Sequence, residues 1–67
     1  MSVYRLISLA LMRRKYVEQL EQVDELIPML KAERLESDLK TAERLRAQII
    51  REMERLDKQI NRLTIRA

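Results

Sequence analysis

The side chains that could carry out catalysis are few in this chain of 67 residues, because it contains neither histidine nor cysteine. Its hydroxyl groups therefore lack the imidazole or thiolate partners on which most nucleophilic sites depend. The hydroxyl residues other than tyrosine are Ser2, Ser8, Ser37, Thr41 and Thr64. The adjacent carboxylates Glu52/Glu54 and Asp24/Glu25 stand among arginines and lysines, and not in the contrasting buried environments that an acid–base pair needs. We therefore expect no enzyme, with no catalytic, cofactor-binding or metal-binding residue.

Basic residues in the second half of the chain suggest another kind of chemistry, the binding of phosphate groups. They recur at steps of three, four or seven, which on a helix forms one outward stripe like those of nucleic-acid-binding surfaces. The basic stripe consists of Arg44, Arg51, Arg55, Lys58 and Arg62. A solvated helix face explains the spacing more simply, because Glu54 precedes Lys58 by four residues and no aromatic residue nearby could stack on bases. A nucleic-acid-binding helical dimer is therefore the alternative function, and protein binding is favoured.

The stripe must be carried by a helix, and residues 35–67 have the periodicity of one. With the seven positions of a heptad lettered a to g, apolar residues occupy a and d for about four heptads. The d positions are Leu35, Ala42, Ile49, Leu56 and Leu63, and the a positions are Leu39, Arg46, Met53, Ile60 and Ala67. No glycine or proline interrupts the run, and good helix formers dominate it. The pattern indicates one long amphipathic helix of a coiled coil or bundle.

The first half of the chain has a heptad pattern of its own. Its a positions are Leu6, Arg13, Leu20 and Ile27, and its d positions are Leu9, Tyr16, Val23 and Leu30. Ser2 precedes this pattern and is a suitable N-cap for the helix. A second helix is therefore expected here.

The two patterns do not share a register, because the step from Leu30 to Leu35 is five residues. Pro28 lacks a backbone N–H, so we expect it to end or kink the first helix. Ser37 and Asp38 would serve as caps if the second helix began later. A short connection favours antiparallel neighbours. The sequence thus predicts one all-α domain, an antiparallel helical hairpin assembling into a bundle, with helix 1 at about 3–28, the turn at about 29–34 and helix 2 at about 35–65.

Two arginines occupy a positions within these apolar patterns. Each either lays its methylenes over the core and exposes its guanidinium group, or forms a polar layer that sets register and partner choice. In the hairpin we expect Arg46 to lie close to Glu18 and Glu21, and Arg13 to lie close to Glu52. Arg13 and Arg46 are therefore the candidate register-setting polar core.

The first helix also carries more apolar residues than one neighbouring helix can cover. They lie at b, f and g positions, outside the expected hairpin core, and are Ile7, Leu11, Met12 and Leu26. An apolar surface of this width indicates a second neighbour, which would be another copy, a different protein or a membrane surface. The basic residues nearby would suit an anionic membrane, but the apolar residues do not gather on one side, so membrane binding is disfavoured.

Length and composition lead to the same conclusion. A hairpin of 67 residues buries too little surface to be comfortably stable alone, and without cysteine or histidine neither disulfides nor the usual zinc ligands can help. The 14 basic and 11 acidic residues nearly balance, as on a surface of ion pairs.

The apolar window of residues 3–12 is too short to span a bilayer, and it precedes its basic cluster, unlike a secretory signal. A mitochondrial presequence is a minor alternative. The sequence predicts a cytoplasmic, non-enzymatic interaction module (an adaptor, small chaperone or regulator) that binds itself, a protein partner or both.

A first prediction follows from this coupling of folding to association. The chain should be mostly helical in solution, and its melting temperature should rise with protein concentration, because mass action favours the associated folded state. Circular dichroism melts over a hundredfold range of concentration measure this. A melting temperature that stays constant for a monomer would contradict self-association while leaving the hairpin intact.

Overall fold

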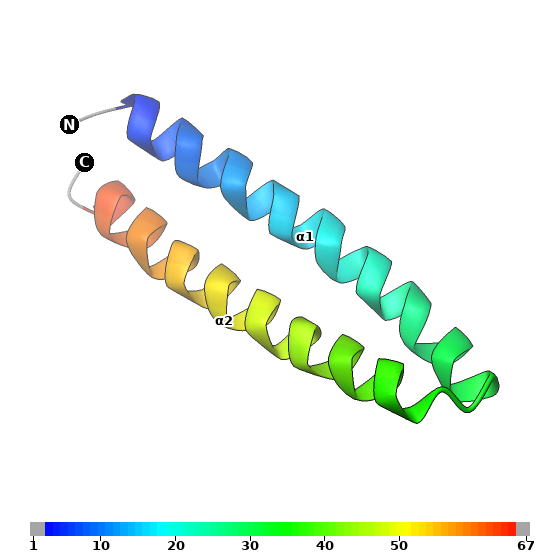
Figure 1. Cartoon of the computed structure of the whole chain (residues 1–67). Helices are drawn as coiled ribbons and strands as arrows, with labels where there is room; N and C mark the ends of the chain where they lie inside the picture. Colours follow the sequence, from blue (N-terminus) through cyan, green and yellow to red (C-terminus); the bar gives the residue numbers. More distant parts are fainter. Residues whose placement is uncertain (1–2, 66–67) are drawn as a thin grey trace.

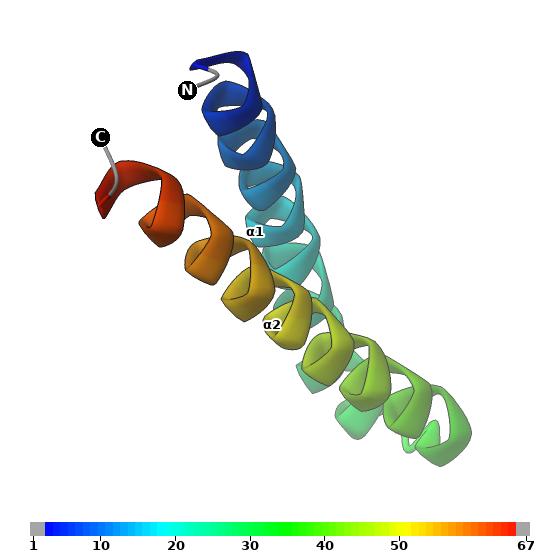
Figure 2. The same ribbon diagram turned by 90° about the vertical axis from the view of Figure 1, so that its left-hand side faces the viewer.

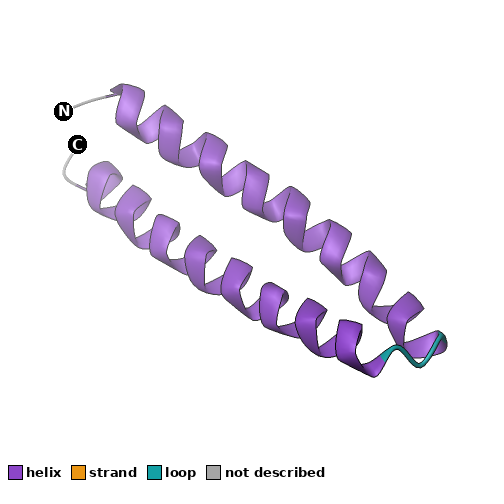
Figure 3. Cartoon of the chain, in the orientation of Figure 1, coloured by secondary structure: helices purple, strands orange, loops and turns teal. Residues whose placement is uncertain are grey.

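The computed structural model describes residues 3–65, which form two α-helices lying side by side (Figure 1). Helix α1 spans Val3–Ala32 and helix α2 spans Glu36–Ile65. The helices run antiparallel, so the start of α1 and the end of α2 lie together at what we term the open end, opposite the turn. The connection between them is the only non-helical part of the described chain (Figure 3). The predicted all-α helical hairpin is confirmed.

The core of the hairpin is a single layer of side chains between the two helices. All six buried residues occupy d positions of the predicted heptads: Leu9, Val23, Leu30, Ala42, Ile49 and Leu56. Most a positions are half-buried, whereas Arg46 is exposed. No described side chain is completely enclosed, and the most buried, Ile49, keeps 3% of its surface accessible. Two helices therefore supply a continuous but thin core.

The core is best developed between the turn and the middle of the hairpin. Val23, Leu30, Ala42 and Ile49 form one cluster, against which half-buried residues such as Tyr16 pack. A view turned by 90° shows that the helix axes are inclined and separate toward the open end (Figure 2). Leu9 and Leu56 are still buried in this half, but none of the described residues beyond them toward the open end is buried.

The first helix is longer than the sequence predicts. It continues through Pro28 to Ala32, so the turn comprises residues 33–35 instead of 29–34. Pro28 is exposed and removes only one donor from the helix, the one that would bond the carbonyl of Asp24. The turn beyond it carries Leu30, which is buried against α2. Burial of that leucine explains why packing overrides the helix-ending tendency of proline.

The end of α1 is closed by two backbone hydrogen bonds of the Schellman type. The N–H of Leu35 donates to the carbonyl of Leu30 at 3.0 Å, and the N–H of Arg34 donates to that of Lys31 at 3.2 Å. Arg34 has φ of 58°, the left-handed conformation that this motif requires and that glycine usually supplies. A chain without glycine thus makes its sharpest turn at an arginine, at a cost in conformational energy.

The second helix begins at Glu36 and not at the later cap sites. Leu35 occupies the N-cap position, since its carbonyl accepts the first helical bond from the N–H of Leu39 at 2.9 Å. Ser37 and Asp38 lie within the first turn, where the Ser37 carbonyl accepts a bond from Thr41 Oγ1 at 3.1 Å. The later start, which would have used these two residues as caps, does not occur, and the helix begins close to the predicted residue 35. The expected N-cap Ser2 and the last heptad position, Ala67, lie outside the described residues.

The strained turn leads to a second prediction. Arg34→Gly should raise the free energy of unfolding by about 0.5–1 kcal/mol, because glycine adopts positive φ freely, a gain offset in part by its greater entropy when unfolded. Urea denaturation measures the change. The control is Glu33→Gly at the preceding residue, which has no positive φ to relieve and should lose stability. Equal losses in both variants would show that the turn stores no such strain.

Candidate interaction surfaces

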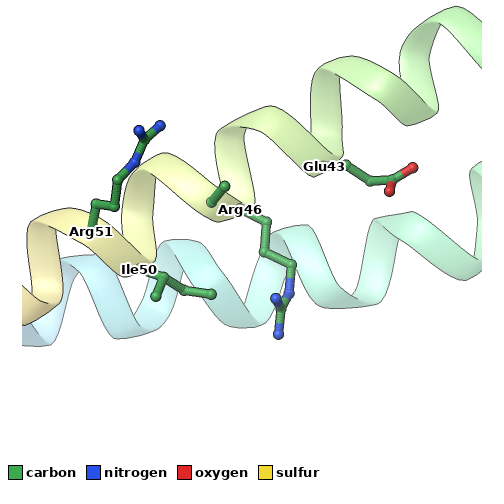
Figure 4. Close-up of a pocket in the computed structure, with 5 residues that line it drawn as sticks. Glu43, Arg46, Ile50 and Arg51 are labelled. Carbon is green, nitrogen blue, oxygen red and sulfur yellow. The ribbon is translucent and has the colours of Figure 1, made fainter.

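One long edge of the hairpin is closed by two ion pairs that join the helices. Arg46 Nε donates to Asp24 Oδ1 at 2.7 Å, and Arg13 Nε donates to Asp57 Oδ1 at 2.6 Å. We term this edge the ion-pair flank, formed by these four residues. Figure 4 shows the Arg46 side chain reaching from α2 across to α1, while Arg51 points away from α1.

The partner of Arg46 differs from the sequence prediction of Glu18 and Glu21. Side chains on a helix tilt toward its N-terminus, so Arg46 leans along α2 toward the turn and meets Asp24. The later position of the turn also brings later residues of α1 level with Arg46. Glu18 instead lies 3.7 Å from Arg14 on its own helix.

The same tilt corrects the predicted partner of Arg13. Arg13 leans along α1 toward the open end and so reaches Asp57, beyond the expected Glu52. Glu52 lies 3.9 Å from Arg55 within α2. The side chains of both cross-helix pairs keep between 42% and 47% of their surface exposed. Each arginine therefore covers the core with its methylenes and pairs at the rim, which combines the two expected roles.

The four apolar residues proposed as a binding surface are all exposed, by 45–56%. The structure does not bring them together on one face. At about 100° per residue, Ile7 and Leu11 lie on the outer side of α1 with Tyr4, whereas Met12 and Leu26 lie on the edge opposite the ion-pair flank. The hairpin therefore presents two apolar surfaces. We term the first, formed by Tyr4, Ile7 and Leu11, the outer face.

The second apolar surface follows the edge where the g positions of both helices meet. We term it the Leu26 flank and define it by Met12, Gln19, Leu26, Leu45 and Gln48. Three adjoining grooves connect these residues. Leu26 and Leu45 line the first, Gln19, Leu45 and Gln48 line the second, and Met12 and Gln19 line the third.

Leu45 is the apolar residue of this surface that sequence reasoning missed. It lies outside the a and d positions of the core, and it keeps 45% of its surface exposed. The signal was present in the heptad letters, because g positions of antiparallel helices face each other and Leu45 and Leu26 are both g. The surplus apolar surface therefore belongs to both helices and not to α1 alone.

The basic stripe of Arg44, Arg51, Arg55, Lys58 and Arg62 is exposed along its whole length. Its residues occupy c and f positions on the outer side of α2, spanning roughly 27 Å at 1.5 Å per residue. Arg55 lies 3.9 Å from the Glu52 carboxylate, so part of its charge is compensated. The geometry agrees with a solvated helix face.

Residues 3–65 offer neither a metal-binding cluster nor a membrane-spanning helix. That part of the chain contains no group of three or more histidine, cysteine, aspartate or glutamate side chains arranged to hold a metal ion. Neither helix of the described chain contains a stretch apolar and long enough to cross a lipid bilayer.

Comparison with models of protein families, with curated proteins and with solved structures finds no match to this chain.

The exposed ion pairs give a third prediction. Arg46→Leu should raise the free energy of unfolding by about 1 kcal/mol, because a half-exposed ion pair contributes little while a leucine at this a position packs on the core. Asp24 is itself half exposed and remains hydrated after the change. Thermal and urea unfolding measure the effect. Asp24→Asn removes the same pair without adding apolar surface and should cost no more than about 1 kcal/mol. A clear loss of stability in Arg46→Leu would show that the pair stabilises the hairpin substantially.

Proposed function

We propose that this chain is a protein–protein interaction module, an adaptor, small chaperone or regulator in the cytoplasm, that works through the apolar side chains left exposed on its helices. One observation carries the proposal. Ile7, Leu11, Met12 and Leu26 remain about half exposed because the hairpin offers α1 only one neighbouring helix. Large apolar residues concentrated in this way are typical of surfaces that a partner covers.

The energetics indicate that the partner must cover more than these four residues. Complete burial of one large apolar side chain contributes about 1.5–3 kcal/mol, so covering the remaining half of four yields roughly 3–6 kcal/mol. Association costs an estimated 4–15 kcal/mol in lost rigid-body freedom. Leu45 and Met29, which keep 45% and 60% of their surface exposed, supply additional area next to Leu26. A partner that covers the Leu26 flank of both helices therefore fits better than one that touches α1 alone.

Nucleic-acid binding through the basic stripe is the alternative. The five exposed cations support it, but α2 contains no aromatic residue for base stacking. The two functions respond differently to salt. Binding to phosphates weakens steeply as salt is added, whereas apolar docking is nearly insensitive.

The proposal leads to a fourth prediction, tested with the double variant Leu11→Glu/Leu26→Glu. Both apolar surfaces then carry a carboxylate, which a partner would have to bury, so association with the chain itself or with proteins captured from its native source should be lost. Sedimentation equilibrium and quantitative capture measure the two forms of association. Circular dichroism should show the helices retained.

The matched control is Ser37→Glu/Asn61→Glu, which adds the same two charges to exposed polar positions on the outer side of α2. It should associate like the parent. Equal association by parent, double variant and control would rule out the apolar surfaces as the binding sites. Loss of a captured nucleic acid on charge reversal of Arg51 and Arg55 would then favour the alternative.

A further inference from the structure

The two edges of the hairpin differ in charge in a way that the interaction proposal alone does not explain. The ion-pair flank is closed by Arg13–Asp57 and Asp24–Arg46. Neither of these two pairs involves a residue of the Leu26 flank. Its defining residues are all uncharged, and the charged residues lining its grooves are Lys15, Asp38 and Glu52. An apolar partner can therefore approach this edge without breaking either of these cross-helix ion pairs.

Charge is also distributed unevenly along the length of the hairpin. In the open half, residues 3–17 and 51–65, there are eight basic and three acidic residues, a net charge of +5. In the half that contains the turn, residues 18–50, there are five basic and eight acidic residues, a net charge of −3. The molecule is thus basic at one end and acidic at the other, so a second copy placed head to tail meets complementary charge.

The α1 side of the Leu26 flank has a spacing suited to pairing with itself. Met12 and Leu26 lie seven residues before and after Gln19, on the same side of the helix. When two α1 helices pack antiparallel with Gln19 on a twofold axis, Met12 of one copy meets Leu26 of the other, and each Gln19 meets its equivalent. The apolar contacts then occur in symmetric pairs on both sides of a central polar residue.

We propose that the Leu26 flank is the site of association with a second copy of this chain, packed antiparallel so that the turn of each hairpin lies at the open end of the other. The inference rests on the proposed function and names its partner. In this arrangement α1 packs on α1 and α2 on α2, which yields a four-helix bundle whose neighbouring helices are all antiparallel.

A glutamine layer at the centre of this bundle sets its register. Gln19 and Gln48 line the same groove, so the twofold axis brings two glutamines from each copy together. Amide groups donate and accept hydrogen bonds and can pair reciprocally when water is excluded. The parallel arrangement, with both turns at one end, is disfavoured because it places the two open halves of charge +5 side by side.

Two matched leucine substitutions on α1 test whether the Leu26 flank is the site of self-association. Leu26→Glu should weaken self-association by about tenfold or more, while Leu11→Glu on the outer face should leave it within about twofold of the parent. Sedimentation equilibrium, with the parent at twice the chain mass of 8.1 kDa, measures both. If Leu26→Glu fails to fold by circular dichroism, Leu45→Glu tests the same flank from α2. A parent that remains at the monomer mass, or a dimer disrupted by Leu11→Glu and not by the flank variants, overturns the inference.

The orientation is tested by a label at the turn, which stays clear of the proposed contact. The chain has no cysteine, so Glu33→Cys provides a unique site for a nitroxide. Glu33 lies 14 residues beyond Gln19, and in the antiparallel dimer two labels should therefore be roughly 40 Å apart at 1.5 Å per residue. A pulsed dipolar distance below about 20 Å indicates the parallel dimer and overturns the inference. A monomeric parent whose captured partner is lost in Leu11→Glu/Leu26→Glu overturns self-association and leaves the proposed function standing.

Discussion

The six buried side chains of this hairpin all occupy d positions, and the rest of the structure depends on that single layer. This layer holds α1 against α2 and so determines which edge each remaining residue faces. Because Leu30 belongs to it, α1 stays helical beyond Pro28. The layer is also thin. Because two helices can enclose a side chain only from two directions, even Ile49 remains slightly accessible, and the half-buried a positions contribute less. A core of this kind stabilises a helix pair and leaves much of its apolar surface in need of another neighbour.

The arginines at a positions divide the two edges of the hairpin. Their tilt toward the N-terminus of each helix carries them to Asp24 and Asp57, both at e positions, so both ion pairs fall on the same edge. The opposite edge, where g positions meet, retains the exposed side chains of Leu26 and Leu45, and neither of these two pairs reaches it. Half-exposed pairs contribute little to stability. Their main consequence is geometric. They place the cross-helix ion pairs on one edge, and the exposed leucines Leu26 and Leu45 lie on the other.

This asymmetry bears directly on function. An interaction module needs a surface whose burial is favourable, and covering the exposed leucines of the Leu26 flank breaks neither cross-helix ion pair. The basic open half and acidic turn half add a direction to that surface, because they favour one orientation of a second copy over the other. The outer face of Tyr4, Ile7 and Leu11 remains uncovered in such a dimer.

Much of this molecule follows from the sequence alone, because heptad spacing is a local property. The positions of Leu9, Val23 and Ile49 in the core, and the exposure of Leu11 and Leu26, could be read from steps of three and four residues without knowledge of the partner helix. The same holds for the all-α class, since a chain without glycine and with a single proline has few means of forming anything else.

Only the tertiary structure decided the features that depend on how the two helices are placed relative to each other. Helix α1 ends at Ala32 and not near Pro28 as predicted, because burial of Leu30 outweighs one lost hydrogen bond. The turn that follows has Arg34 in the left-handed conformation. The later position of the turn, together with the direction in which helical side chains tilt, paired Arg46 with Asp24 and Arg13 with Asp57. The addition of Leu45 to the surface around Leu26 likewise depends on the partner helix. Periodicity identifies the side of a helix on which a residue lies, but only packing determines what faces it.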